Sequence, residues 1–176
     1  TAVLMGGPDI LTSLASGAID AAEWICPVAD LGLGMHQAAK FYYGPGWHEP
    51  STLLDLSIDL KEWEGLDADT QALMMEMAKA FNVDVFSRFQ ALNGPALGKL
   101  LNEHGVQLKT FPDELLIALG NAAGEVMEER GSIDSQTKAI CNHILSFRKN
   151  IMDWSTKGES EFARIRNLPF KFPDSV

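Results

Sequence analysis

The chain has 176 residues, enough for one ordinary hydrophobic core or two small lobes, and its 46% hydrophobic and 22% charged content is typical of globular proteins. Its net charge of −10, from 24 acidic and 14 basic residues, argues against nucleic acid and anionic membrane surfaces as partners. The uncharged apolar runs are shorter than the roughly 20 residues that cross a bilayer, and the start TAVLMGGPD does not look like a signal peptide.

The N-terminal segment predicts a strand, a helix and a second strand. Residues 3–5 look like a strand end, Pro8 suits the first position of a helix, and Gly17 suits its end. A strand over 21–25 would complete a βαβ-like unit. Its last residues include Glu23 and Trp24, at the strand end where ligands gather in open α/β sheets. Because this strand is apolar, we expect Glu23 to be buried and to need a partner.

The next segment predicts a helical stretch over 28–40, the loop FYYGPGWHEP and a strand over 52–58. Glycine and proline punctuate the loop, which carries a second carboxylate, Glu49, close to Trp47 and His48. Taken alone, a mixed aromatic and acidic loop is more often surface structure than a binding site.

From residue 67 onward the pattern is mainly helical. Pro95 is expected to open a separate short helix that stops near Gly105, followed by a strand over 106–111 and a helix that begins at Pro112. Before Pro95, apolar residues at intervals of three or four predict a long amphipathic helix. Its Met-rich segment LMMEMAKAF is expected to pack in the core. These residues are Leu73, Met77, Phe81, Val85, Phe89 and Leu92.

The segment 132–176 predicts a helical tail, distinct from lobe remnants over 1–131. Its apolar residues follow a heptad spacing over slightly more than two heptads, too short for a firm coiled-coil prediction. This seam either packs against the chain's own lobes or forms a contact with a second copy. It consists of Ile140, Ile144, Phe147, Ile151 and Trp154.

The cysteines and histidines give no pattern typical of a zinc site. Cys26 and Cys141 are interpreted as small buried hydrophobes, although their spacing leaves a disulfide open. The four histidines form no ligand pair at helical spacing.

Two motifs carry a family resemblance. The sequence GAIDAAEW, followed some two dozen residues later by GWHE, resembles the solute-binding subunit of tripartite ATP-independent periplasmic (TRAP) transporters. The similarity is to the branch that receives 2-oxo acids and related monocarboxylates, and it spans essentially the whole chain. It implies an α/β fold that is part of a two-lobe, type II-like periplasmic binding protein, with crossing strands and a long helical C-terminal segment.

The resemblance also implies a ligand site. Glu23 and Glu49 match two acidic ligands of a bridging sodium or calcium ion, and Trp24 matches a residue whose carbonyl joins the coordination and whose ring walls the pocket. Trp47 and Tyr43 match further pocket walls less securely. Hard cations prefer such oxygen ligands, and the ion would let an acidic protein bind an acid. The alternative is that a backbone N–H or an arginine satisfies Glu23.

The resemblance implies that this chain is the C-terminal half of a longer periplasmic receptor. The family's ligand-binding arginine would then lie before Thr1, and TRAP membrane subunits would be the partners. The exact ligand stays open, as does the choice between sodium and calcium.

Two alternative functions stand beside a receptor that binds a small carboxylate. One is an enzyme that uses Glu23, Glu49 and His48 as acid and base, but no nucleophile arrangement or phosphate loop supports it. The other is a sensory or helical interaction module on the same fold. Pyruvate-like and lactate-like acids are the expected ligands of the receptor, which is not an enzyme.

Overall fold

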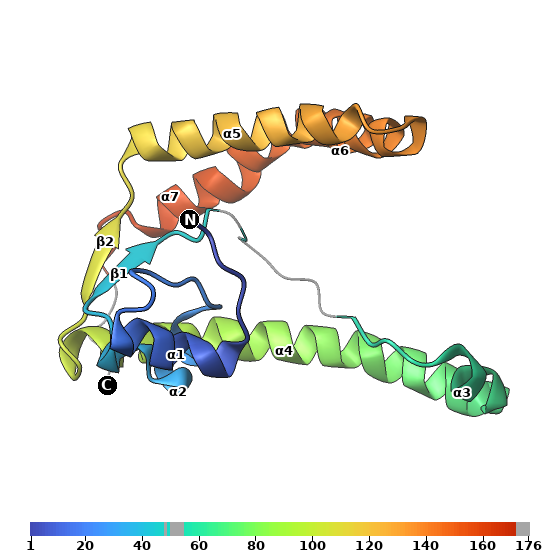
Figure 1. Cartoon of the computed structure of the whole chain (residues 1–176), viewed down its shortest axis with the longest axis horizontal. Coiled ribbons are helices and arrows are strands. Elements are labelled where there is room, and N and C mark those ends of the chain that lie inside the picture. The colour runs from blue at the N-terminus through green and yellow to red at the C-terminus, as the bar shows by residue number, and fades with distance from the viewer. Residues whose placement is uncertain (48, 50–54, 172–176) are drawn as a thin grey trace. The chain divides into compact units, whose positions relative to one another are not determined.

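The computed structural model describes residues 1–47, 49 and 55–171 (Figure 1). The chain divides into two compact units, 1–111 and 112–176. The expected division into lobe remnants over 1–131 and a helical tail over 132–176 falls inside the second unit, and it remains a prediction. None of the described helices is long and apolar enough to cross a membrane.

The first unit begins with two short helices that glycine ends. Gly17 and Gly34 close them in the left-handed conformation, with φ of 74° and 81°, which glycine adopts without the cost of a Cβ atom. The first helix was expected to begin at Pro8 and stop at Gly17; it begins one residue earlier, at Gly7, and its stop at Gly17 is confirmed. The helices are α1 (Gly7–Ser16) and α2 (Pro27–Leu33), and a short 3-10 turn, η1 (Met35–Gln37), follows.

The long helix α4 (Ala68–Asn102) dominates this unit (Figure 1). Asp67 caps its start by accepting a hydrogen bond from the Thr70 N–H at 2.8 Å. The prediction of a new helix at Pro95 is wrong, because the helix continues through that residue. Helix α2 packs against α4. A short helix that the sequence pattern did not predict, α3 (Leu60–Gly65), directly precedes α4.

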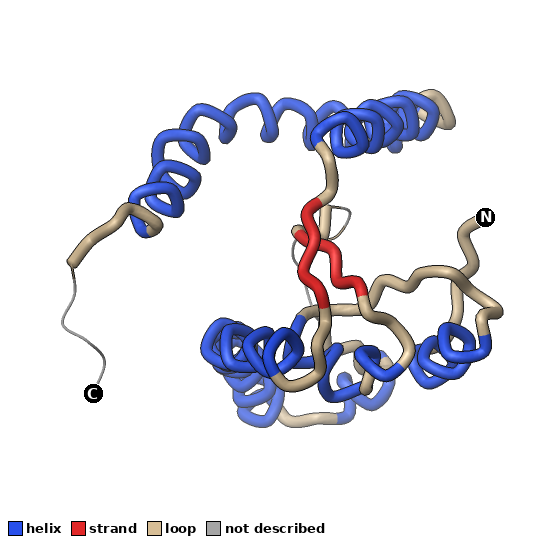
Figure 2. Tube along the Cα trace, turned by 90° about the vertical axis from the view of Figure 1, so that its left-hand side faces the viewer, coloured by secondary structure: helices blue, strands red, loops and turns tan. Residues whose placement is uncertain are grey.

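Two parallel strands form the sheet in the described part of the chain (Figure 2). Phe41 lies opposite Gln107, and Gly44 lies opposite Thr110. Strand β2 (Gln107–Thr110) agrees with the strand predicted over 106–111. Strand β1 (Phe41–Gly44) lies where a loop was expected. Gly44 is the last residue of the strand, and Pro45 and Gly46 follow it.

Three strand predictions fail or lie outside the description. Residues 3–5 and 21–25 are irregular, since a segment without a neighbouring strand gains no ladder hydrogen bonds. The strand predicted over 52–58 is absent from its described part, 55–58, while 52–54 lie outside the described residues.

The second unit is helical. Helices α5 (Asp113–Gly131) and α6 (Ser135–Ser155) pack together, and Gly131 lies close to the buried Cys141. A π-helical turn, η2 (Thr156–Ser160), and α7 (Glu161–Arg166) follow. Cys141 and the half-buried Cys26 are both free thiols.

The apolar side chains of α4 are more exposed than the sequence pattern predicts. The Met-rich part of α4 is exposed, with Met77 61% and Phe81 62% accessible, so the described residues of the first unit do not enclose it in a core. The buried apolar residues of the first unit instead include Ile10, Ala96, Leu100 and Val106. Helix α2 is short, and it leaves most of α4 uncovered.

The seam on α6 is also largely exposed. Ile140, Ile144, Phe147 and Trp154 are 49–65% accessible. Within the second unit, these four side chains are therefore largely uncovered. Packing against the chain's own lobes and contact with a second copy therefore both remain predictions for this seam.

Candidate functional site

The segment that contains Glu23 and Trp24 lies between α1 and α2. Glu23 is exposed, so the expectation of a buried carboxylate in a strand is wrong. The irregular backbone places Glu23 at the surface instead of inside a sheet. An exposed carboxylate can reach a cation without a large prior cost of desolvation.

The ring of Trp24 packs closely on the start of α1. A Cβ atom added at Gly7 would lie 2.4 Å from Cη2 of that ring, much closer than the ordinary contact of about 3.5–4.0 Å between carbon atoms. Only a residue without a side chain fits there. The packing against Gly7 therefore fixes where the Trp24 ring lies.

The second candidate segment follows strand β1. Tyr43 is the third residue of that strand, is 49% accessible and stacks on Phe111, with ring centroids 5.0 Å apart. Trp47 and Glu49 lie in the loop beyond it, where Trp47 is 42% accessible and Glu49 is exposed. His48, the third residue considered for an enzyme, lies outside the described residues.

A buried carboxylate, Asp30, connects these two segments. It is 7% accessible and is the buried charged side chain of the described residues. Its Oδ1 accepts a hydrogen bond from the Ile25 N–H at 3.3 Å, and its Oδ2 accepts one from the Tyr42 hydroxyl. One side chain thus bonds to the residue after Trp24 and to the residue before Tyr43.

Burial and hydrogen bonding act in opposite directions on Asp30. Burial raises the pKa of its carboxyl, while the hydrogen bond from Tyr42 and those from the amides of Ile25 and Cys26 lower it, and burial prevails. Burial and the neighbouring Asp30 charge both raise the pKa of the Tyr42 hydroxyl, so Tyr42 is the donor at neutral pH.

Helix α2, which carries Asp30, is anchored on α4. The Val28 N–H donates to Asn93 Oδ1 at 3.1 Å, in addition to the packing of the two helices. A cavity of about 30 Å³ lies beside Asp30, with Leu100 and Val106 in its wall. Asp30 therefore lies on a helix that is itself attached to α4.

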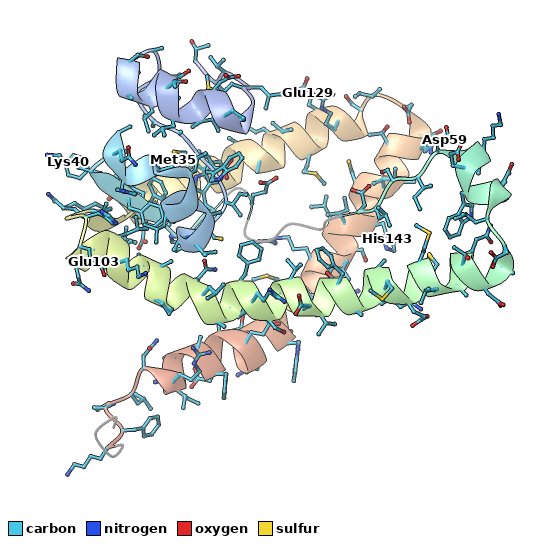
Figure 3. All side chains as sticks on the ribbon, turned by 90° about the horizontal axis from the view of Figure 1, so that it is seen from below. Met35, Lys40, Asp59, Glu103, Glu129 and His143 are labelled. Atoms are coloured by element: carbon cyan, nitrogen blue, oxygen red, sulfur yellow. The ribbon has the colours of Figure 1, made fainter. Side chains whose placement is uncertain are left out.

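A stacked pair of histidines, His36 and His104, lies beside the cavity next to Asp30, and His36 lines that cavity. The rings of His36 and His104 lie 3.9 Å apart, and among the described residues the His36 Nδ1 is a buried atom without a hydrogen-bonding partner. Burial and the nearby His104 lower the pKa of His36, so neutral stacking is favoured. Figure 3 shows Met35 near Lys40, in the part of the chain that lies at the Glu103 end of α4.

The donor chemistry of the candidate residues fits a hard cation. Two exposed carboxylates, Glu23 and Glu49, and the Trp24 carbonyl offer only oxygen, which sodium and calcium prefer. The described residues contain no group of three or more histidine, cysteine or acidic side chains placed to hold a metal. A complete coordination shell would therefore need carbonyl, water or ligand oxygens besides the carboxylates.

Sequence reasoning missed Asp30, Tyr42 and Gly7. A usable pattern existed for Asp30, since an acid in the first turn of a helix opened by Pro27 often accepts from amides just before the helix. The packing of Gly7 against Trp24 had no comparable pattern, because it joins residues that are brought together only by the fold.

Known proteins resemble this chain over nearly its whole length. It is 36% identical over 160 residues to the monocarboxylate 2-oxoacid-binding periplasmic protein of Nostoc sp.. The aligned region covers 91% of this chain and 43% of the Nostoc protein. The chain thus spans less than half the length of this curated relative.

Solved structures of TRAP solute-binding proteins share the fold at 29% identity. One from Colwellia psychrerythraea, with bound calcium and pyruvate, has a TM-score of 0.84 over 92% of this chain and 49% of its own. One from Pseudoalteromonas atlantica, with bound sodium and pyruvate, scores 0.81 over 93% and 48%. One from Bordetella bronchiseptica, a mixed-occupancy dimer with copurified calcium and picolinate, scores 0.83 over 92% and 48%.

A family model describes most of the chain. The model for bacterial extracellular solute-binding proteins of family 7 matches residues 3–132, which include both candidate segments and all of the first unit from its third residue. These are transport proteins that bind solutes, not enzymes, and the fold expected from the resemblance is confirmed by the solved structures. The chain belongs to the family 7 bacterial extracellular solute-binding proteins, as a TRAP solute-binding protein.

Proposed function

We propose that this chain forms the C-terminal half of a periplasmic receptor that binds a small carboxylate through a sodium or calcium ion. The ligand would be a 2-oxo acid such as pyruvate, or a lactate-like monocarboxylate, and the receptor would deliver it to the membrane subunits of a TRAP transporter. The observation that carries the proposal is the match to relatives with bound pyruvate and a hard cation, over more than nine-tenths of this chain.

Glu23, Glu49 and the Trp24 carbonyl are the proposed metal ligands, and Trp24, Tyr43 and Trp47 are the proposed walls. When bound, the cation would supply positive charge that attracts the ligand carboxylate to an acidic protein. The packing of Trp24 on Gly7 and of Tyr43 on Phe111 supports the proposal, since both rings are held by neighbours while keeping accessible surface.

A second copy is the proposed partner of the seam on α6. The four seam residues that are at least 49% accessible would bury apolar surface in a homodimer. The dimer of the Bordetella bronchiseptica relative supports this proposal without assigning the surface.

A titration of tryptophan fluorescence with calcium or sodium, with and without pyruvate, tests the metal site. It is made on this chain and on the chain extended to the length of its relatives, with Glu23→Gln as the site variant. Glu64→Gln is the matched control, because it removes the same charge from an exposed residue of α3. We expect a saturable change that Glu23→Gln weakens at least tenfold and Glu64→Gln preserves.

A second variant, Trp24→Phe, separates the contribution of the Trp24 ring from that of the Trp24 carbonyl. Trp24→Phe keeps the backbone carbonyl and removes the indole, so calorimetry should still detect calcium while much of the fluorescence change disappears. If the extended wild-type chain binds neither cation with pyruvate, the receptor proposed here is wrong.

A further inference from the structure

We propose that Asp30 is a positioning residue that orients the Trp24 carbonyl toward the cation site. This inference rests on the proposed function, because the Trp24 carbonyl is a ligand only in that proposal. The carboxylate itself is buried and does not need to touch the metal or the ligand.

The first step is the planarity of one peptide group. The Trp24 carbonyl and the Ile25 N–H belong to the same peptide unit, and in a trans peptide they point in opposite directions. Asp30 Oδ1 accepts from this N–H at 3.3 Å. Holding the N–H toward Asp30 therefore directs the carbonyl away from the buried carboxylate, and rotation of the peptide would break the hydrogen bond.

The hydrogen bond from the Ile25 N–H to Asp30 also changes the charge on the Trp24 carbonyl oxygen. A carboxylate that accepts from the N–H polarises the peptide and increases the negative partial charge on the carbonyl oxygen. A carbonyl with more negative charge is a better ligand for a hard cation. Ligands of bound metals commonly depend on such outer hydrogen bonds for both orientation and strength.

The third step is the rigidity of Asp30 itself. Its helix is tied to α4 through Val28 and Asn93, and its second oxygen accepts from Tyr42 on strand β1. Tyr42 is adjacent to Tyr43 and pairs with Leu108 in the sheet. Asp30 therefore holds the Trp24–Ile25 peptide at a fixed place relative to the strand that leads to Trp47 and Glu49.

Four variants test this arrangement in the chain extended to the length of its relatives. Asp30→Ala removes both hydrogen bonds, and Tyr42→Phe removes only the bond to the strand. Asp30→Asn retains an amide oxygen that can accept from Ile25. Leu100→Ala is the control, because Leu100 is 2% accessible and lines the same cavity without bonding to the peptide.

Two measurements are made well below the unfolding midpoint of each variant. Hydrogen exchange of the Ile25 amide in metal-free protein reports the hydrogen bond directly, and calorimetry with calcium, with and without pyruvate, gives the dissociation constant. We expect Asp30→Ala to lose Ile25 protection and to bind calcium about 10- to 100-fold more weakly. Asp30→Asn should recover part of both, and Tyr42→Phe should keep the protection with a smaller loss of affinity.

The control separates positioning from stability. Leu100→Ala should unfold at a lower temperature and keep both the Ile25 protection and the calcium affinity. Equal weakening by Leu100→Ala and Asp30→Ala would overturn the inference, as would unchanged calcium affinity in Asp30→Ala. If Asp30→Ala does not fold, Asp30→Asn and Tyr42→Phe decide the question, and unchanged calcium affinity in both overturns the inference.

Failure of the proposed function has a different signature. Wild-type protein that binds no calcium or sodium with pyruvate refutes the receptor and, with it, any role of Asp30 toward a cation. Wild-type binding together with an unprotected Ile25 amide refutes only the role of Asp30.

Discussion

Replacing Gly7 with alanine should disturb the packing of Trp24 and destabilise the first unit. Gly7 is the first residue of α1, and nothing about its backbone prevents a side chain. The obstacle is the Trp24 ring, three of whose atoms would lie 2.4, 3.0 and 3.2 Å from the new Cβ. To reach an ordinary carbon contact, the ring must withdraw by about 1 Å.

Two opposing terms set the size of the effect. Overpacking of this kind costs about 1–3 kcal/mol, whereas alanine in place of a helical glycine gains about 0.5–1 kcal/mol. The gain is smaller at the first position of a helix than in its interior, so the cost prevails. We expect Gly7→Ala to lower the free energy of unfolding by about 1 kcal/mol.

Gly98→Ala is the matched control. Gly98 lies inside α4, where an added Cβ would meet nothing within 4 Å, so this variant should gain about 0.5–1 kcal/mol. Unfolding of both variants is followed by circular dichroism in urea, and tryptophan emission reports the displaced ring. Equal or greater stability of Gly7→Ala relative to wild type, with unchanged emission, would refute the contact as described.

Two further predictions concern acid and assembly. Hydrogen bonds from the Thr70 and Thr137 amides hold the pKa of Asp67 and Asp134 below 3.8, so these caps stabilise α4 and α6 fully above pH 3.8 and less as pH falls through the lowered pKa. Helix content measured against pH should therefore decrease there in wild type and less so in Asp134→Asn, and parallel curves would contradict this. Ile144→Asp should shift sedimentation from dimer to monomer while calcium and pyruvate affinity persist; an unchanged dimer would exclude the seam.

Local patterns predicted helix ends better than strands. Gly17 was recognised as a stop because a left-handed residue there costs glycine nothing, and Asp67 marks a start because its carboxylate accepts from a free amide. These interactions connect residues a few positions apart. They are therefore visible in the sequence and are retained in the structure.

Strands depend on a partner that the local pattern does not name. Residues 21–25 have the composition of a buried strand and remain irregular, while Phe41–Gly44 looked like a loop and pairs with Gln107–Thr110. The pairing partner lies more than sixty residues away in the chain. Composition alone could not identify it, since strand stability comes from the ladder and not from the isolated segment.

The candidate site follows the same division. The residues named from the resemblance, such as Glu23 and Glu49, could be identified from their neighbours in sequence. Asp30 could not be given its role this way, because that role depends on Ile25 and Tyr42 meeting at one buried carboxylate. The residues proposed to touch the cation were thus more predictable than the residue proposed to orient one of them.

The exposed face of α4 indicates that the proposed receptor needs a second part to cover it. Helix α4 has 35 residues and α2 only 7, so α2 can cover about a fifth of its length at 1.5 Å per residue. The chain exposes 14,631 Å², whereas two separate compact units of its total mass would expose about 10,000 Å². Large apolar faces of this kind are normally covered by another part of a protein or by a partner.

In the receptor proposed here, the other half supplies that cover and the opposite wall of the ligand site. The proposed cation ligands, Glu23, Glu49 and the Trp24 carbonyl, all lie within this chain. The resemblance assigns the arginine that pairs with the ligand carboxylate to the other half. Cation binding and ligand binding should therefore separate when this chain is studied alone. Pyruvate should strengthen calcium binding much less in the 176-residue chain than in the extended protein, because only the extended protein contacts the ligand from both sides.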